Sequence, residues 1–320
     1  MKICFISQNN HFGKLYRSFE NCRTEFAWQI ALDADHFSFS DWTFSNVIYD
    51  LAIVILPKKL ELLDTDILLK NLKLRCKKIT VMQEGPAWYF QDYKYSDQVN
   101  FINFLMEMDF LLVHNKSDVP YFKGIFKKPV YNLQSLMIED SIKGVVRSNN
   151  QSPIIGGNFC SWYGGLDSYF VAQNFNKKIY IPSMGRKIEN EELFPNLQHL
   201  PYMLWKEWIL TLSQFNVGIH LMRTHAAGTF ALNCAYLGIP CIGYKGLDTQ
   251  ETLHPDLSVS VGDVERANSL AIQLRDNKEF YNYCSETAKN NYNRSYTEKV
   301  WLQNWNLILN EQKLHNDGGN

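Results

Sequence analysis

Residues 225–250 of the chain read HAAGTFALNCAYLGIPCIGYKGLDTQ, and the second half of the sequence is best understood from them. An apolar run at 217–221 precedes this segment and predicts a buried parallel strand. The apolar pattern that begins at Gly228 predicts a helix, which ends at the Gly-then-Pro signal of 238–240. A second apolar run at 241–244 predicts the next strand. This order of strand, small-residue turn, helix and strand indicates an α/β fold with a parallel sheet.

The turn before this helix is suited to binding an anion. The backbone N–H groups of Ala227, Gly228 and Thr229 point out of the helix N-terminus, which carries about half a positive charge. Arg223 and His225 add side-chain donors beside them. The pattern therefore predicts a phosphate site. The alternative is an ordinary β-α-β unit in which the histidine is hydrogen-bonded within the protein.

The spacing of these residues resembles the donor-binding signature of GT-B glycosyltransferases. In that signature a His contacts the diphosphate, a Glu on the helix holds the ribose, and a Gly-x-Pro segment and an Asp-Gln pair follow. Here His225, residues 238–240 and Gln250 match the signature, whereas Asn233 replaces the Glu and Thr249 replaces the Asp. Retaining relatives have Glu at both the His225 and Asn233 positions, so the resemblance leaves inversion or retention open.

The resemblance implies two Rossmann-like α/β domains that face each other across a cleft. Apolar periodicity is lost between 141 and 152, so we expect an acceptor-side domain at 1–150 and a nucleotide-sugar domain at 151–320. The resemblance also implies that the last helix, about 297–313, packs on the first domain. The implied donor-binding residues are Arg186, Tyr202, Arg223, His225, Ala227, Gly228, Thr229, Asn233, Asp248, Thr249 and Gln250. Of these, Arg186 follows a predicted strand and would replace a cation that relatives carry elsewhere; a surface arginine is the alternative.

The composition excludes several classes of protein. Of the 320 residues, 46% are hydrophobic, which is enough for a large core. The net charge of −1 does not favour a nucleic-acid or membrane partner. The seven cysteines have no metal-binding spacing and indicate a reducing compartment. Neither a signal peptide nor an apolar run of the roughly 20 residues needed for a membrane span is recognisable. We therefore expect a cytoplasmic protein without a membrane span.

Two residues of the first half are candidates for catalysis. Glu84 follows a predicted strand at 78–83 and precedes a Gly-Pro turn, at the strand end where open α/β sheets bind ligands. We predict that it is the general base, with a carboxylate that caps loop N–H groups as the alternative. His11 lies in the loop after the first strand, which faces the cleft in GT-B proteins. His11 is predicted to be the base in place of Glu84 or to orient Glu84; the alternative is an ordinary loop residue.

The implied reaction is transfer of a hexosyl or pentosyl group from a nucleotide-diphosphate sugar, with a UDP-sugar favoured, to an acceptor hydroxyl. GT-B enzymes stabilise the leaving diphosphate with helix N–H groups and side-chain cations. No Asp-x-Asp pair occupies a plausible metal-binding turn in the sequence. We therefore expect no metal and no further cofactor.

Other functions remain open on the same fold. A nucleotide-sugar epimerase would use the same diphosphate site without an acceptor pocket. A non-catalytic subunit that scaffolds a glycosyltransferase would agree with the absence of Glu at position 233. For a transferase, the acceptor could be a surface glycan, a lipid-linked glycan, a protein or a hydroxymethylated DNA base.

Overall fold

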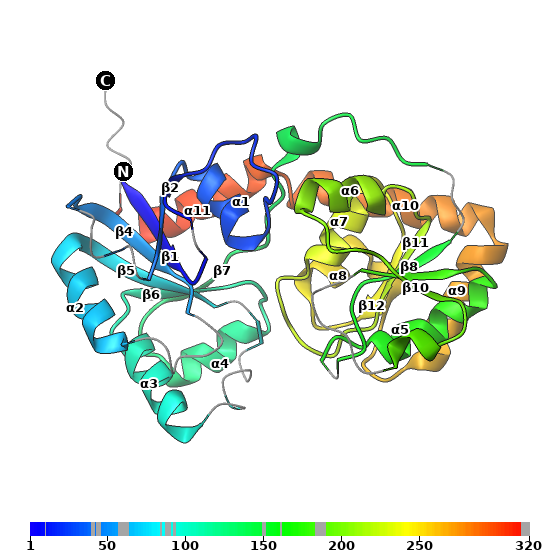
Figure 1. The fold of residues 1–320 in the computed structure, drawn as a ribbon, viewed down its shortest axis with the longest axis horizontal. Coiled ribbons are helices and arrows are strands. Elements are labelled where there is room, and N and C mark those ends of the chain that lie inside the picture. The colour runs from blue at the N-terminus through cyan, green and yellow to red at the C-terminus, as the bar shows by residue number, and fades with distance from the viewer. Residues whose placement is uncertain are drawn as a thin grey trace. The chain divides into compact units, whose positions relative to one another are not determined.

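The chain folds into two compact α/β units (Figure 1). Unit 1 comprises Met1–Ile138 and Glu298–Asn320, and unit 2 comprises Glu139–Thr297. The computed structural model describes residues 1–9, 11–39, 42, 46–56, 64–83, 85–86, 91, 94–148, 152–160, 162–182 and 190–314. Within these ranges, no helix combines the length and the apolar character that are needed to cross a membrane.

In the part of unit 1 that the structure describes, the sheet has seven strands in the order β2-β3-β1-β4-β5-β6-β7, and only the β2–β3 pair is antiparallel. Its strands are β1 Ile3–Ser7, β2 Gly13–Lys14, β3 Asp35–Ser38, β4 Tyr49–Val54, β5 Cys76–Gln83, β6 Phe110–Val113 and β7 Val130–Asn132. Every residue of β1 and β6 is buried, as expected for parallel strands that are covered on both faces. The helices between strands are α1 Thr24–Ala31, α2 Thr65–Arg75, α3 Tyr95–Met106 and α4 Asp118–Ile125.

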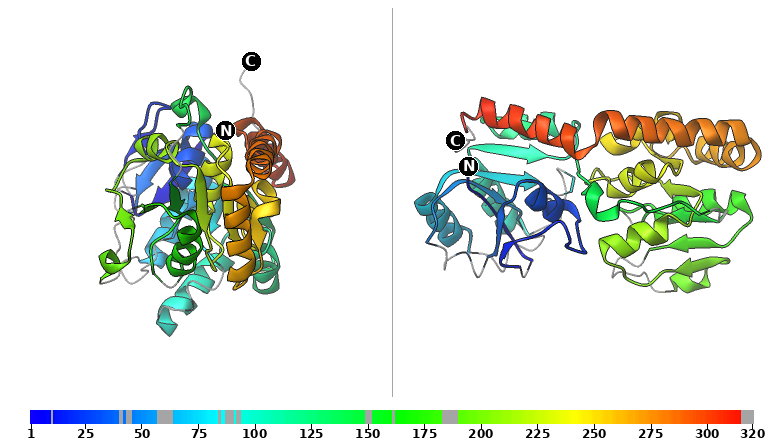
Figure 2. Two further views of the ribbon diagram at one scale, coloured as in Figure 1. Left: turned by 90° about the vertical axis from the view of Figure 1, so that its right-hand side faces the viewer. Right: turned by 90° about the horizontal axis from the view of Figure 1, so that it is seen from above.

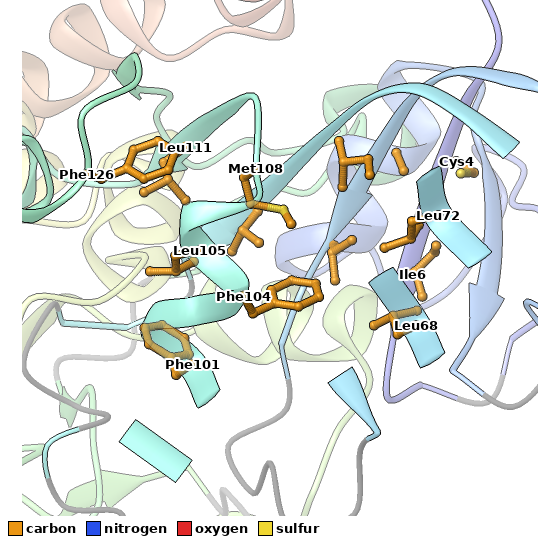
Figure 3. Close-up of a cluster of buried hydrophobic side chains, with 14 of the residues drawn as sticks. Cys4, Ile6, Leu68, Leu72, Phe101, Phe104, Leu105, Met108, Leu111 and Phe126 are labelled. Atoms are coloured by element: carbon orange, nitrogen blue, oxygen red, sulfur yellow. The ribbon is translucent and has the colours of Figure 1, made fainter. Parts of the chain in front are cut away.

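Side chains from α2 and α3 fill one side of the unit 1 core (Figure 3). Leu68 and Leu72 on α2 and Phe104 on α3 are at most 4% exposed. They lie in one cluster with Ile6 of β1 and Leu111 of β6. Burial of each such side chain stabilises the unit by about 1.5–3 kcal/mol.

The C-terminal helix α11, Glu298–Glu311, belongs to unit 1 although it follows unit 2 in the sequence (Figure 2). Trp301 and Trp305 on this helix are at most 2% exposed, and their rings are stacked at 6.0 Å. The ring of Trp28 in α1 lies 5.3 Å from that of Trp301, whose Nε1 donates to the Gln134 carbonyl at 2.8 Å. These contacts give the apolar face of α11 its partners.

The sheet of unit 2 has six parallel strands in the order β10-β9-β8-β11-β12-β13. Its strands are β8 Pro153–Ile155, β9 Ile179–Ile181, β10 Leu197–His199, β11 Val217–His220, β12 Cys241–Tyr244 and β13 Ser258–Val259. Its helices are α5 Gly165–Ala172, α6 Trp205–Leu212, α7 Thr229–Leu237, α8 Asp248–Leu253, α9 Val264–Asp276 and α10 Lys278–Ser295. If the strands of unit 2 are numbered from β8 as the first, their order across the sheet is 3-2-1-4-5-6, the order of doubly wound nucleotide-binding sheets. Such sheets bind ligands at the carboxyl ends of the strands, at the point where the strand order reverses. In this chain the reversal lies between β8 and β11.

The division between the units falls earlier than the expected boundary at residue 150, because the segment after Ile138 packs on unit 2. Tyr292 of α10 donates to the Glu139 carboxylate at 2.8 Å. The Arg147 guanidinium donates to the carbonyls of Gly238 at 2.7 Å and Asn216 at 3.2 Å. The loss of apolar periodicity after residue 141 indicates where the linker lies. It does not indicate the unit to which the linker belongs, because the residues that bind it are distant in sequence.

Candidate functional site

The turn between β11 and α7 places a helix N-terminus at the carboxyl edge of the unit 2 sheet. Gly228 is the N-cap residue of α7 with φ = 65°, and no side chain caps this helix end. A Cβ atom on Gly228 would lie 2.0 Å from Oγ1 of Thr249, so both the backbone angle and the close contact require glycine. The N–H groups of Gly228 and Thr229 lie in the first turn, where a helix provides no carbonyl partner.

His225 lies against the next loop of the same edge. A Cβ atom on Gly246, in the loop after β12, would lie 2.2 Å from Nε2 of His225. Gly246 has φ = 112°, and its N–H donates to the Glu251 carboxylate at 2.6 Å. The turn before α7 therefore packs on the loop after β12 through His225 and Gly246, and on α8 through Gly228 and Thr249. The structure thus brings together the residues predicted at 225–229 and one of those predicted at 248–250.

Arg223 is held by two residues that the sequence did not identify as site residues. Its Nη2 donates to Oδ2 of Asp167 at 2.9 Å, and the hydroxyl of Tyr244 donates to the same oxygen at 2.9 Å. The Asp167 hydrogen bond raises the pKa of the Arg223 guanidinium, and burial together with Asp167 raises the pKa of Tyr244 to about 12. The Arg223 side chain is 55% exposed, so it is oriented and still accessible. The position of Asp167 in the first turn of α5 was the only sequence signal for this network.

Three predicted donor contacts are buried within unit 2. Gln250 is 1% exposed and its Nε2 donates to the Cys241 carbonyl at 2.9 Å, which joins α8 to β12. Asn233 and Thr249 are each 3% exposed. Their Oδ1 and Oγ1 atoms are buried without a hydrogen-bond partner in the part of the chain that is described. A buried polar atom without a partner costs about 1–3 kcal/mol, which a water or ligand group could offset.

The remaining predicted residues differ in their exposure to solvent, and two of them are not described by the structure. Tyr202 lies in the segment before α6 and is 59% exposed, and Asp248 is a half-buried residue at the start of α8. Ala227 is 8% exposed in the turn before Gly228. Arg186 and Glu84 lie outside the described residues.

His11 in unit 1 belongs to a small polar cluster at the end of β1. His36 Nδ1 lies 2.8 Å from the His11 carbonyl, and His36 Nε2 lies 2.9 Å from Ser7 Oγ. A carbonyl can only accept, so Nδ1 carries the proton and Ser7 donates to Nε2. Burial lowers the pKa of His36 and so favours its neutral form. Nε2 of His11 is buried without a partner among the described residues.

We found no group of three His, Cys, Asp or Glu side chains arranged to hold a metal ion within the described ranges. The positive groups at the candidate site are instead the α7 N-terminus and the Arg223 guanidinium. This arrangement can bind an anion through backbone and side-chain donors.

Known structures resemble the chain over most of its length. An alpha-glucosyltransferase solved in complex with UDP-glucose and DNA containing an abasic site has a TM-score of 0.65 and 13% identity, over 97% of this chain and 99% of its own. TarM from S. aureus, solved with fondaparinux, alpha-GlcNAc-glycerol and UDP, has a TM-score of 0.62 and 11% identity, over 84% of this chain and 58% of its own. Sucrose-phosphate synthase from Thermosynechococcus elongatus has a TM-score of 0.61 and 13% identity, over 83% of this chain and 75% of its own.

The class of fold follows from these matches. The chain has the GT-B fold of these glycosyltransferases, as the sequence predicted. No protein-family profile and no curated protein sequence matches the chain. It spans nearly the full length of the alpha-glucosyltransferase and about three fifths of TarM.

Proposed function

We propose that the chain is a glycosyltransferase that moves a sugar from a nucleotide-diphosphate sugar to an acceptor hydroxyl. The observation that carries this proposal is the α7 N-terminus, which Gly228 opens at the carboxyl edge of the sheet beside Arg223 and His225. A diphosphate there would receive backbone N–H groups, the helix dipole and a guanidinium. The GT-B fold and the neighbours that were solved with UDP support UDP as the nucleotide.

The same residues would stabilise the leaving group during the reaction. Breaking the glycosidic bond leaves negative charge on the diphosphate, and preorganised donors that face this charge lower the barrier. Arg223 and the α7 N-terminus supply such donors, so the proposed reaction needs no metal ion. Asn233 Oδ1 is buried without a described partner and would accept a hydrogen bond from a ribose hydroxyl.

The acceptor is the second part of the proposal. The match along 99% of an alpha-glucosyltransferase that was solved with UDP and DNA containing a HMU base supports a hydroxyl on a modified DNA base as one acceptor. The matches to TarM and to the pneumococcal O-GlcNAc transferase GtfA, solved with UDP and GlcNAc, support a glycan or protein hydroxyl as another. The chain's net charge of −1 favours the second group of acceptors.

A ligand screen by thermal unfolding tests the donor site. UDP, GDP, ADP and dTDP and their sugar conjugates are compared with UMP, which lacks the second phosphate. A nucleoside diphosphate at about 100 times its Kd should stabilise the protein by about 2.7 kcal/mol, and UMP should stabilise it less. No shift with any diphosphate or nucleotide sugar would contradict the proposal and favour the scaffold function.

The reaction is then tested with the donor that binds. Incubation with hydroxymethylated DNA, glycan, lipid-linked and protein acceptors should transfer label from the sugar to one class. Conversion of the nucleotide sugar to an isomer without any acceptor would instead indicate an epimerase. Inspection of the anomeric configuration of the product decides between inversion and retention.

A further inference from the structure

A hollow on unit 2 lies between α5, the following turn η5 (Gln173–Phe175), and α9. Its volume is about 590 Å³, within the range of about 300–1,000 Å³ that is common for small-molecule sites. Val264 and Arg275 from the two ends of α9 both line it, which corresponds to about 16 Å along the helix at about 1.5 Å per residue. None of the proposed donor-binding residues that the structure describes lines this groove.

Carboxamide groups in this α5–α9 groove are held in fixed orientations. Asn174 Nδ2 donates to Asn268 Oδ1 at 2.7 Å and to the Val171 carbonyl at 3.0 Å. This geometry leaves the Asn174 oxygen as an acceptor and the Asn268 nitrogen as a donor, with no further partner among the described residues. Gln173 Nε2 donates to the Tyr169 hydroxyl at 2.8 Å, which leaves the Gln173 oxygen as another acceptor. The groove therefore offers neutral acceptors and donors side by side.

Among the described residues that line the groove, Arg275 is the one cation, and a carboxylate already neutralises it. Arg275 donates to both carboxylate oxygens of Asp276 at 2.6 Å, and its Nη1 donates to the Asn174 carbonyl at 2.6 Å. A phosphate would have to compete with this carboxylate for Arg275. The balance of charge therefore favours an uncharged ligand over an anionic one.

Phe170 provides an apolar surface in the same groove. It is 50% exposed on α5, although exposure of a large aromatic side chain costs about 25 cal/mol for each Å² of apolar surface in contact with water. The face of an aromatic ring is electron-rich, and the C–H groups on one side of a sugar ring carry the complementary partial charge. Vicinal sugar hydroxyls pair with neighbouring carboxamide acceptors and donors.

We propose that the α5–α9 groove binds a short, uncharged oligosaccharide at a site separate from the donor site. Phe170 packs on a sugar ring, and Asn174, Asn268 and Gln173 bind its hydroxyls. The length of the groove along α9 accommodates more than one ring. The proposal does not depend on the proposed transferase reaction, because it rests only on the groove residues.

Calorimetric titration of the full chain tests the site. The probes are linear tri- and tetrasaccharides of glucose, N-acetylglucosamine, galactose and mannose, with inorganic phosphate as the anionic comparison. At least one oligosaccharide should bind with a Kd of about 1 mM or tighter, and phosphate should not compete with it. Failure of every oligosaccharide to bind, or displacement by phosphate, would overturn the proposal.

Two variants locate the binding. Phe170→Ala removes the ring, and Asn268→Asp removes the donor while it keeps an acceptor for Asn174. Each should weaken oligosaccharide binding at least tenfold, which is about 1.4 kcal/mol. Leu210→Ala, at an α6 side chain that is 54% exposed, is the matched control and should bind as the unmodified chain does. UDP binding should be the same in all of them. Equal oligosaccharide binding in Phe170→Ala and Leu210→Ala would refute the assignment.

Discussion

Replacement of Gly228 by alanine tests the geometry on which the donor site depends. The new Cβ atom would lie 2.0 Å from Oγ1 of Thr249 and 3.1 Å from its Cβ, so either the turn before α7 or helix α8 must move. Alanine also has to adopt φ = 65°, which belongs to the left-handed region. Both effects act on the first turn of α7, where the proposed diphosphate contacts begin.

The two effects have separate magnitudes. The left-handed backbone costs an alanine about 1–2 kcal/mol, and forcing extra atoms into a packed site costs about 1–3 kcal/mol. We therefore expect Gly228→Ala to lower the free energy of unfolding by about 2–5 kcal/mol. Gly262→Ala is the matched control, because Gly262 has φ = 87° but nothing within 4 Å of its added Cβ. It should lose only the backbone part, about 1–2 kcal/mol.

A double variant separates the contact from the backbone angle. Thr249→Ala removes the Oγ1 atom that the Cβ of Gly228→Ala would meet, so the pair should recover about 1–2 kcal/mol relative to the sum of the single changes. The assay is urea unfolding followed by tryptophan fluorescence, together with calorimetric titration of UDP. A Gly228→Ala variant no less stable than Gly262→Ala, or a double variant without recovery, would refute the reasoning.

Three further outcomes are expected. His225→Ala should weaken binding of the nucleotide sugar by about 1.5–3 kcal/mol in calorimetry, the range for a hydrogen bond to a charged group, and unchanged affinity would remove His225 from the site. In an inverting enzyme Glu84→Gln should lower turnover by roughly 100- to 10,000-fold with donor binding intact, and near-normal turnover would show that Glu84 is not the base. Burial lowers the pKa values of His114, His220 and His254 to about 4, so the unfolded chain binds more protons than the folded chain below pH 6.5. The free energy of unfolding should therefore be constant above pH 7 and should fall from pH 6.5 toward pH 4, by up to about 1.4 kcal/mol per pH unit for each histidine. A urea midpoint that stays constant between pH 6.5 and pH 4 would contradict this expectation.

Local sequence determined the elements around the candidate site. The apolar runs at 217–221 and 241–244 correspond to β11 and β12, and α7 ends at Leu237, directly before the Gly that was predicted to stop it. Each of these features depends on neighbours in the sequence, such as apolar periodicity or the left-handed angle at a helix end. The small-residue turn therefore predicted the GT-B fold, which the matching structures confirm, and an anion site, which stays a prediction.

Only the tertiary structure decided which side chains from distant elements contact that turn. Asp167 and Tyr244 come from α5 and β12, and packing of both elements against the turn after β11 lets one carboxylate oxygen accept from Tyr244 and Arg223. Gln250 matched the signature by spacing, yet the fold turns its amide inward to the Cys241 carbonyl. Spacing along the chain specifies which face of an element a side chain occupies. The partner it meets there depends on how distant elements pack, and no local pattern carries that information.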